Sequence, residues 1–573
     1  MDYRIRASEW IKLADPSAGQ ELSSLAEKDL EERFYTELEF GTAGLRGIIG
    51  AGTNRMNIYV VRRATQGLAD YLGTLPGAAQ RGVAIAYDSR LYSDTFALEA
   101  ALILAKNGIR AYLFEGLRAV PQLSFAVRHI GCIAGIVITA SHNPPAYNGY
   151  KVYWEHGGQL APAQADAVLS AMARVGYFDA SPMPKEDALA KGLLTMIGRE
   201  EDEAYYSATQ TLLLKPSLLK ERGHLLNIVY TPLHGTGSVP VRELLSRVGV
   251  TNVHIVKEQA DPDPKFPTVQ APNPEDPNAF TLGAALADQV GADVILATDP
   301  DADRLGIAVR EKDGKFSVLT GNQIGCLLLE HILSSLHAQG RLPKNALAVK
   351  SLVSTCLCDA ICDRYGVHLE NVLTGFRFIS EIIDECQRTG EHTFLFGFEE
   401  SYGFLAGGFS HDKDAISSAM LAAELCASCA ERGLTLCDAL QELYRTYGFY
   451  NERAKSYTLL GKEGMEKIAA AMGALRENPA QALGGVVVEY VEDYRSRRRS
   501  RPDGSMASPL LLPSSDMIRI LFKGGAWIVV RPSGTEPKLK LYIGANADSE
   551  KEANALLDNL LQAADQTLSD LLS

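Results

Sequence analysis

The chain has 573 residues, of which 46% are hydrophobic and 22% charged, and its formal net charge is −14. This length is too great for one hydrophobic core and indicates about three to five domains of an ordinary globular protein. The acidic balance argues against a general nucleic-acid binder, although a local cluster of Arg and Lys can still bind an anionic substrate. The opening residues have no apolar signal core and no later run approaches membrane-spanning length, so we expect a cytoplasmic protein with no membrane partner.

Short β-branched runs alternate with helical patterns through most of the chain. The expected strands are residues 83–87, 133–138, 227–230, 253–256, 294–297, 346–350 and 393–396. The helical patterns between them include residues 95–107, 241–248, 278–290 and 322–338. This alternation is typical of repeated βαβ units and predicts α/β domains with mixed or parallel sheets.

Two stretches interrupt the alternation. Residues 261–277 contain six prolines and predict a loop. Residues 495–516, which include Arg-Ser-Arg-Arg-Arg, predict an exposed basic insertion, either a solvated loop or a nuclear or nucleic-acid patch, and the solvated loop is favoured. Beyond it, a strand pair over 517–522 and 527–530 and an amphipathic helix over 549–572 predict a smaller C-terminal α+β domain.

The nine cysteines form no disulfide framework. Two groups could be metal or redox sites: Cys356, Cys358 and Cys362, and then Cys426 and Cys429. Both groups lie in apolar sequence of helical character, with no second Cys or His pair at zinc spacing. Buried free thiols are therefore the favoured interpretation, and an odd number of cysteines fits a reducing compartment.

A serine stands where an expected strand ends. The apolar run 133–138 leads into Thr-Ala-Ser141-His142-Asn, and Pro144-Pro145 then prevents a helical continuation. The carboxyl end of a strand is the usual position for chemistry in open α/β sheets, and a serine there can carry a covalent group. The alternative is a simple turn in which Ser and Asn bond their own backbone. Another expected strand ends in the polar loop Asp88-Ser89-Arg90.

Three carboxylates follow a second buried strand. Asp299, Asp301 and Asp303 occupy alternate positions and would repel one another without a cation. Oxygen ligands with no His or Cys nearby favour Mg²⁺ over zinc. An EF-hand is excluded, because its Gly and Glu positions are occupied here by Arg304 and Arg310. A solvated acidic turn with no function is one alternative to a cation site. Another is an aspartyl phosphotransferase, in which Asp299 or Asp301 would be the nucleophile.

Three more loops have residue types that bind polar ligands. Gly397-Phe-Glu399-Glu-Ser401-Tyr-Gly suits the hydroxyls of a polyol, although a charged turn is an equal interpretation. Arg531-Pro-Ser533-Gly534-Thr535-Glu-Pro-Lys538 offers a guanidinium, hydroxyls and backbone N–H groups to a phosphate, without the Walker spacing. Gly41-Thr42-Ala-Gly-Leu-Arg46-Gly is a similar glycine-rich loop with an arginine. Phosphoryl transfer on a phosphorylated sugar would use all four of these features: a nucleophile, a cation site, a loop that binds sugar hydroxyls, and a loop that binds phosphate, here called the phosphate clamp (residues 531–538).

These segments also resemble a known family. Thr139-Ala-Ser-His-Asn-Pro, Asp299-Pro-Asp-Ala-Asp-Arg, Gly397-Phe-Glu-Glu-Ser-Tyr-Gly and Arg531-Pro-Ser-Gly-Thr-Glu-Pro look like the four signature loops of the α-D-phosphohexomutases, in the family's order. The segment from Gly41 to Asn57 is similar to the phosphoglucomutase-2 branch, which includes phosphopentomutases.

The resemblance implies three related α/β domains with mixed sheets and a smaller C-terminal α+β domain around a central cleft. We expect these domains at residues 1–205, 206–318, 319–445 and 446–573. It further implies a resting enzyme phosphorylated on Ser141, with Mg²⁺ held by Asp299, Asp301, Asp303 and the serine's phosphoryl group. The phosphoryl group passes to the substrate, a sugar bisphosphate forms and turns over, and its other phosphate returns to the serine.

The remaining roles follow from the resemblance by position. Lys151 is a candidate general acid/base, and His142 helps proton transfer or braces the loop, with bracing favoured. Arg304 and Arg46 would contact phosphoryl groups, and Glu399 and Ser401 would read sugar hydroxyls. The substrate phosphate would be bound by Thr42, Arg377, Arg531, Ser533, Gly534, Thr535 and Lys538. Arg377 stands where similar family members have lysine; arginine keeps the charge but does not deprotonate, which puts an acid/base role there in doubt.

We therefore expect a phosphoglucomutase-type isomerase that interconverts glucose 1-phosphate and glucose 6-phosphate, with glucose 1,6-bisphosphate as activator and intermediate. The partners expected are a small phosphosugar, no nucleic acid, and at most a weak homo-oligomer beyond the monomer. A phosphopentomutase, a phosphomannomutase, a sugar-1,6-bisphosphate synthase and a non-catalytic phosphosugar-binding protein remain as alternatives.

Overall fold

The structure is a computed structural model that describes residues 2–39, 44–459, 461–533 and 538–573. The chain forms two compact units, each built from two segments. The first unit holds Met1–Ile324 and Ile379–Gly433, and the second holds Gly325–Phe378 and Leu434–Ser573. No helix among the described residues is long and apolar enough to cross a membrane.

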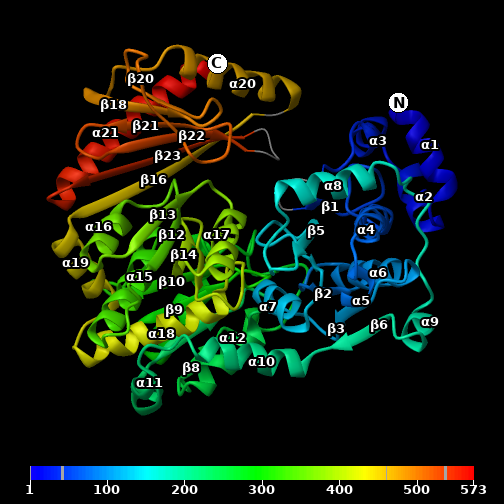
Figure 1. Cartoon of the computed structure of the whole chain (residues 1–573), viewed down its shortest axis with the longest axis horizontal. Helices are drawn as coiled ribbons and strands as arrows, with labels where there is room; N and C mark the ends of the chain where they lie inside the picture. Colours follow the sequence, from blue (N-terminus) through cyan, green and yellow to red (C-terminus); the bar gives the residue numbers. More distant parts are fainter. Residues whose placement is uncertain (1, 40–43, 460, 534–537) are drawn as a thin grey trace. The chain divides into compact units, whose positions relative to one another are not determined.

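The first unit begins with three helices and a six-stranded mixed sheet (Figure 1). The helices are α1 (Tyr3–Leu13), α2 (Pro16–Ser23) and α3 (Glu27–Phe34). The sheet has the order β1-β5-β4-β2-β3-β6, with strands β1 (Leu45–Ile48), β2 (Val83–Tyr87), β3 (Ala111–Phe114), β4 (Ala134–Ile138), β5 (Tyr147–Trp154) and β6 (Leu194–Ile197). Strands β2, β3, β4 and β6 run parallel, β5 is antiparallel to β4, and β1 is antiparallel to β5.

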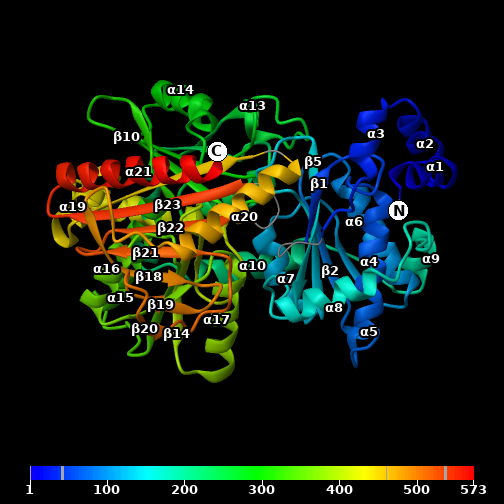
Figure 2. The same cartoon turned by 90° about the horizontal axis from the view of Figure 1, so that it is seen from above.

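Helices cover both faces of this sheet. They are α4 (Ile58–Leu72), α5 (Ala78–Arg81), α6 (Ser93–Lys106), α7 (Val120–Ile130), α8 (Pro162–Met172), α9 (Lys185–Ala190) and α10 (Arg199–Gln210). In β2, Val83 and Ile85 pack with α4, α6 and α8, whereas Ala84 and Ala86 pack with α7 on the other face. Figure 2 shows α4 and α6 on one side of the sheet and α7 on the other. A strand buried on both faces needs a continuous apolar sequence, which Val-Ala-Ile-Ala supplies.

A five-stranded mixed sheet follows within the same unit, in the order β11-β10-β9-β7-β8. Its strands are β7 (Ile228–Thr231), β8 (Val253–Ile255), β9 (Val294–Thr298), β10 (Leu305–Arg310) and β11 (Phe316–Val318). The helices are α11 (Pro216–Arg222), η1 (Gly223–Leu225), α12 (Ser238–Arg247), α13 (Lys257–Ala260), η2 (Pro277–Phe280) and α14 (Thr281–Val290). Between α13 and η2 the structure has no helix or strand, which confirms the predicted proline-rich loop.

The next stretch is shared by the two units. It contains α15 (Gly321–Ala338), β12 (Ala346–Ser351), α16 (Leu357–Tyr365), β13 (His368–Val372), α17 (Phe376–Thr389), β14 (Thr393–Glu399), β15 (Gly403–Ala406), α18 (Ala415–Glu431) and α19 (Leu436–Tyr447). In the second unit, β12 and β13 form a parallel pair. In the first unit, β14 and β15 form an antiparallel pair next to the almost entirely buried helix α18.

An antiparallel sheet and two helices complete the second unit. The strands are β16 (Phe449–Thr458), β17 (Ala482–Leu483), β18 (Val486–Asp493), β19 (Arg498–Ser500), β20 (Met506–Pro509), β21 (Ile518–Phe522), β22 (Trp527–Pro532) and β23 (Lys538–Ala547). Apolar side chains of α20 (Gly461–Glu477) and α21 (Glu550–Leu572) pack with alternate residues of the long strands, and Figure 1 shows both helices along the sheet.

The predicted fold class is confirmed: three α/β regions with mixed sheets are followed by a C-terminal region of strands and helices. The domain limits at 205, 318 and 445 stay predictions. The insertion expected over 495–516 is exposed along most of its length, but it is not a loop throughout, because β19 and β20 extend the C-terminal sheet as a hairpin. Arg499 ion-pairs with the buried carboxylate of Glu492, so part of the arginine run serves packing within the fold.

The nine cysteines are free thiols, and seven of them are buried.

Candidate active site

Ser141 lies in the turn that follows β4, at the carboxyl end of a strand that is buried along its whole length. The residue is 3% exposed, and its φ of 50° lies in the left-handed region, which a serine rarely adopts. Its backbone N–H donates to Thr139 Oγ1 at 2.8 Å, and Thr139 Oγ1 donates to Asp301 Oδ2 at 3.1 Å. A side-chain hydrogen bond thus joins this turn to Asp301, in the turn between β9 and β10 of the second sheet.

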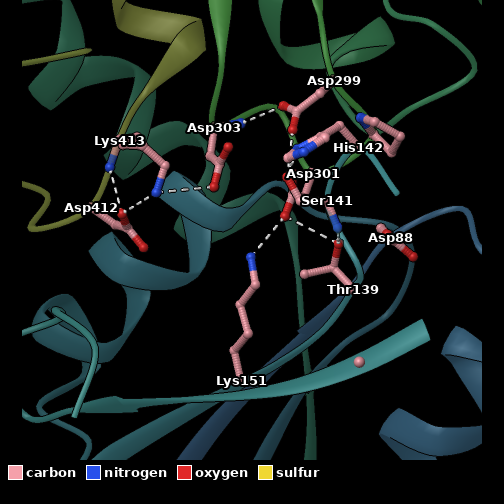
Figure 3. Close-up of polar contacts among 12 residues, drawn as sticks. Asp88, Thr139, Ser141, His142, Lys151, Asp299, Asp301, Asp303, Asp412 and Lys413 are labelled. Carbon is pink, nitrogen blue, oxygen red and sulfur yellow. Dashed lines mark hydrogen bonds and ion pairs between the residues drawn. The ribbon is translucent and has the colours of Figure 1, made fainter. Parts of the chain in front are cut away.

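The three predicted carboxylates meet in front of this serine (Figure 3). They lie in the hairpin turn between β9 and β10, where Ala302 also has a positive φ of 50°. Asp299, Asp301 and Asp303 are at most 2% exposed, and one oxygen of each lies within 4.8 Å of the others. The Ser141 hydroxyl donates to Asp299 Oδ2 at 2.7 Å.

Two lysines balance the negative charge of this cluster. Lys151 Nζ lies 3.1 Å from Asp301 Oδ2, and Lys413 Nζ lies 3.2 Å from Asp303 Oδ2. Burial and the charges of its two neighbours raise the pKa of Asp299 well above its ordinary value. Burial also acts upward on Asp301, but the charge of Lys151 outweighs it and lowers the pKa of that carboxyl. Asp301 is therefore the carboxylate most firmly held as an anion.

The cluster fits a hard divalent cation. Asp301 Oδ1 and Asp303 Oδ1 are buried and accept no hydrogen bond from any described residue. Such buried acceptors are costly unless a cation binds them, and carboxylate oxygens are the ligands that Mg²⁺ prefers. The observed donor set can therefore hold a metal ion beside Ser141.

His142 lies next to the serine, with its Nδ1 3.2 Å from Ser141 Oγ. Burial, followed by the positive charges of Arg304 and Arg46, lowers the pKa of His142 well below its ordinary value. The imidazole is therefore neutral around pH 7. Because the Ser141 hydroxyl donates its one proton to Asp299, an Nδ1–H of this ring would be the donor to Ser141 Oγ.

The arginines expected to contact phosphoryl groups have protein partners in this structure. Arg304 ion-pairs with Glu275 from the proline-rich loop and lies 3.9 Å from Asp303 Oδ1. Arg46 donates to Asn143 Oδ1 at 3.0 Å, which joins β1 to the serine turn. Both guanidinium groups therefore lie beside the predicted nucleophile loop or the acidic loop.

The loop with Glu399 and Ser401 lies against the acidic loop. Strand β14 ends at Glu399, which is 9% exposed. Tyr402 follows with a φ of 66°, and its carbonyl accepts the backbone N–H of Leu305 at 3.0 Å. The negative charge of Glu399 acts on the pKa values of both Arg304 and Lys413. The first unit thus brings Glu399 to the serine and carboxylate cluster.

Sequence reasoning missed Lys413 and its support. Lys413 Nζ also lies 2.9 Å from Asp412 Oδ1, and Tyr153 donates to Asp412 Oδ2 at 2.7 Å. Burial opposes the charge of Lys413, but Asp303 and Asp412 outweigh it and raise its pKa, so Lys413 is a cation. The polar run Ser410-His-Asp-Lys-Asp414 directly before the apolar sequence of α18 was the available signal.

The predicted phosphate clamp lies in the second unit. Arg531 donates to Thr374 Oγ1, and the Ser533 N–H donates to the carbonyl of Lys538 at 2.7 Å. The guanidinium of Arg377 lies over the ring of Phe378, 4.6 Å from its centroid. Thr42, Gly534 and Thr535 lie outside the described residues. The second unit therefore brings the segment just before α17, with Arg377 in the first turn of that helix, to the end of β22, which contains Arg531.

Comparisons with known proteins agree with this architecture. Three family models described as "Phosphoglucomutase/phosphomannomutase, alpha/beta/alpha domain" match the chain: domain I over residues 37–177, domain II over 203–314 and domain III over 320–447. A fourth model, the C-terminal domain of the same family, matches residues 463–563. The phosphoglucomutase of Staphylococcus haemolyticus is 36% identical over 561 residues, which cover 96% of this chain and 98% of that protein. The phosphoglucomutase of Staphylococcus aureus strain USA300 is 36% identical over 571 residues, with the same coverage.

Solved structures share the fold. The phosphoprotein pp63/parafusin of Paramecium, a phosphoglucomutase in an open form, has a TM-score of 0.69 at 16% identity and covers 94% of this chain and 96% of its own. A phosphoglucomutase/phosphomannomutase family protein of Burkholderia thailandensis has a TM-score of 0.63 at 19% identity and covers 92% and 97%.

The matches span four successive regions, in the order that a sugar phosphomutase has them. The chain belongs to the phosphoglucomutase/phosphomannomutase family, which confirms the predicted α-D-phosphohexomutase resemblance. Its activity is that of a sugar phosphomutase.

Proposed function

We propose that this protein interconverts glucose 1-phosphate and glucose 6-phosphate, with Ser141 as the carrier of the phosphoryl group. The observation that supports it most directly is the 2.7 Å hydrogen bond from the Ser141 hydroxyl to Asp299, within a cluster of three buried carboxylates. Glucose is proposed as the sugar because the relatives that match nearly the whole chain are named phosphoglucomutases.

Asp299, Asp301 and Asp303 would hold Mg²⁺ together with an oxygen of the phosphorylated serine. When bound, the ion would stabilise the negative charge of the transferring phosphoryl group. The buried and unbonded oxygens of Asp301 and Asp303 support this assignment.

The proposed cycle has two transfers. Phosphoserine 141 gives its phosphoryl group to the free hydroxyl of glucose 1-phosphate, whose proton leaves to a nearby base, and glucose 1,6-bisphosphate and free serine form. After the bisphosphate has turned over, the bond between phosphorus and the C1 oxygen breaks as the phosphoryl group passes to Ser141, whose hydroxyl loses its proton. The C1 oxygen takes up a proton, so glucose 6-phosphate is released and phosphoserine 141 is regenerated. Lys151 is the proposed acid/base, because its ammonium group lies 3.1 Å from Asp301 within the cluster. His142 would brace the turn through its contact with Ser141 Oγ, because its lowered pKa makes the neutral ring a weak base.

The remaining assignments concern substrate binding. Glu399 and Ser401 would bind sugar hydroxyls, and Arg304 and Arg46 would exchange their present partners for phosphoryl oxygens. The phosphate that does not react would be bound by Thr42, Arg377, Arg531, Ser533, Gly534, Thr535 and Lys538. We further propose a cytoplasmic protein, which the nine free thiols support, since disulfides are rare in reducing compartments.

The test supplies the protein with glucose 1-phosphate, Mg²⁺ and catalytic glucose 1,6-bisphosphate, and measures glucose 6-phosphate. Ser141→Ala should lower kcat by roughly 10³-fold or more, because no carrier for the phosphoryl group remains. Its melting temperature should stay close to that of the wild type. Ser207→Ala, which removes an exposed helix hydroxyl bonded to Glu203, is the matched control and should keep full activity.

Parallel kinetics on mannose, ribose and deoxyribose 1-phosphates identify the preferred sugar, and a higher kcat/KM for one of them would replace glucose. A sugar-bisphosphate synthase would prefer a different phosphoryl donor and accumulate the bisphosphate. Intact mass spectrometry should find one phosphoryl group that survives hydroxylamine. A phosphoryl group that hydroxylamine removes would instead identify an aspartyl phosphate and contradict the role of Ser141.

A further inference from the structure

Arg90 lies in the polar loop that follows β2, the strand next to β4 in the first sheet. Its side chain is 0% exposed, so it cannot reach a substrate from this position. A fully buried guanidinium is uncommon and has to be paired and hydrogen-bonded. Its partners are therefore informative about its role.

Four backbone carbonyls of residues 141–147, the turn after β4 and the first residue of β5, accept hydrogen bonds from this one side chain. The Nη2 atom of Arg90 donates to the carbonyl of Ser141 at 2.6 Å and also to that of Asn143. The Nη1 atom donates to the carbonyls of Pro144 at 2.9 Å and Tyr147 at 3.1 Å. Residues 139–146 have no helix or strand, so these bonds supply much of the order of the turn.

Two further groups fix the guanidinium itself. Asp88 Oδ2 lies 3.3 Å from Arg90 Nε, and Asp88 Oδ1 accepts the Ser93 hydroxyl at 2.7 Å and the Arg90 N–H at 2.9 Å. The guanidinium carbon also lies 5.0 Å from the ring centroid of Phe266, which belongs to the proline-rich loop. The guanidinium thus has an ion-pair partner on its Nε side, without a hydrogen bond between the two atoms, and an aromatic ring over one face.

We propose that Arg90 is a positioning residue that holds Ser141 in its left-handed conformation and so aims its hydroxyl at the carboxylate cluster. The inference rests on the proposed role of Ser141 as phosphoryl carrier. A left-handed serine is strained by about 1 kcal/mol or more and persists only where its surroundings fix it. The bond to the Ser141 carbonyl fixes the peptide directly after the strained residue. A misplacement of about 1 Å can cost 10²-fold in rate.

Arg90→Lys tests this role. Lysine keeps the charge, but its single ammonium group has three donors and cannot reproduce the planar fork that serves four carbonyls. We expect kcat to fall by about 10²-fold and KM to change less than about threefold, because Arg90 does not reach substrate. The rate at which glucose 1,6-bisphosphate phosphorylates Ser141, followed by intact mass, should fall by the same factor as kcat.

Arg63→Lys is the matched control. Arg63 is also a buried arginine of the first domain, bonded to the carbonyl of Val175 at 2.8 Å and to Glu37 at 2.7 Å, away from the serine turn. The Arg63→Lys variant should have a lower melting temperature, as Arg90→Lys does, while its kcat per folded molecule stays within about twofold of the wild type. If Arg90→Lys does not fold, Asp88→Asn and Phe266→Leu loosen the guanidinium and should each lower kcat by about three- to tenfold at constant KM.

The outcomes separate this inference from the proposed function. An inactive wild type without phosphoserine would overturn the proposed function. An active wild type in which the Arg90, Asp88 and Phe266 variants keep kcat within twofold would overturn the role of Arg90 alone. Equal losses of kcat in the Arg90 and Arg63 variants would also overturn it, because they would show a general effect of stability.

Discussion

Asp299 is held in an unfavourable environment in the absence of a cation. It is fully buried, its Oδ1 accepts the N–H groups of Asp303 and Arg304, and two more carboxylates lie within 4.8 Å. Burial and the neighbouring charges raise its pKa, which means that ionised Asp299 destabilises the folded chain. Functional sites commonly lower the stability of the fold in this way.

Asp299→Asn should therefore stabilise the protein in EDTA while abolishing its response to Mg²⁺. The amide keeps an oxygen for the two backbone N–H groups but removes one of the repelling charges. We expect the melting temperature in EDTA to rise by roughly 2 °C, and the rise that Mg²⁺ gives the wild type to disappear.

Asp293→Asn is the control, because this aspartate of the same domain is exposed and pairs with Arg310. It should leave the Mg²⁺ response unchanged. A lower melting temperature of Asp299→Asn in EDTA would show that the carboxylate stabilises the fold and would contradict the prediction.

The sequence allowed the carboxylates to be predicted but not their counter-ions. Asp299, Asp301 and Asp303 are close in the sequence, and their spacing alone suggests a cation site. Lys413 follows them by about 110 residues, so only the tertiary fold brings it to Asp303. Similarly, nothing local to Asp88-Ser89-Arg90 indicates that Arg90 binds carbonyls of residues 141–147.

At the scale of an element, α18 shows how a buried helix depends on its first residue. Asp414 is its N-cap and accepts the N–H of Ser417 at 2.9 Å and the hydroxyl of Tyr205 at 2.9 Å. The carboxylate is fully buried, and burial raises the pKa of Asp414 to about 6 in spite of these bonds. The cap is therefore protonated in mild acid.

This pKa predicts a pH-dependent effect of Asp414→Asn. The ordinary pKa of an unfolded aspartate is about 3.9, so the native state binds the proton more tightly. The stability that Asp414 contributes is fully present below about pH 4 and is lost as the pH rises through about 6. Asparagine stays neutral, so the variant should gain stability relative to the wild type between pH 4 and 7, by up to about 3 kcal/mol.

Melting temperatures of both proteins at pH 4.5, 6 and 7.5 measure this gain. Tyr205→Phe removes a hydrogen bond that favours the ionised carboxylate, so it should move the transition to higher pH. A difference between Asp414→Asn and wild type that is constant with pH would contradict the assignment.

Prediction of the elements succeeded where the apolar pattern was regular. Strand β2 and the ends of the C-terminal helix were predicted to within a residue, because β2 is a continuous apolar run and the helix has a regular apolar period. The exposure of residues 495–516 was predicted, but the two short strands within them were not, because an arginine-rich sequence has no apolar alternation. The pairing of β19 with β18, and of Arg499 with Glu492, depends on residues that local composition does not reveal. Helix α12 begins three residues before the predicted start, since Pro240 is tolerated in a first turn.

At the scale of the whole molecule, the residues proposed to hold the metal ion all belong to one unit. Asp299, Asp301, Asp303, Ser141 and the two lysines lie within Met1–Ile324 and Ile379–Gly433. The second unit holds Arg377, at the start of α17, and Arg531, near the end of β22. Binding of the ion and binding of the distal phosphate are therefore assigned to different units.

Hydrogen exchange should reveal this division. Saturating Mg²⁺ should slow exchange in peptides that cover residues 134–151, 294–310 and 403–418, because the ion joins these segments. Peptides from β18 to β23 should exchange at the same rate with and without the ion.

Asp299→Asn is the control and should show no Mg²⁺-dependent change in any peptide. Slowing of β18 to β23 as large as that in residues 294–310 would show that the units respond together and would contradict the prediction.

The discontinuous first unit also sets an order of events on the ribosome. Asp303 and Tyr205 leave the ribosome before their partners Lys413 and Asp414 have been translated. At roughly 5–20 residues per second, the 110 or so residues between Asp303 and Lys413 take about 5–20 s to make. During this interval the nascent chain holds an acidic cluster without one of its two cations and lacks α18. We therefore expect a chain released before residue 413 to be bound by chaperones or degraded, and to have no mutase activity.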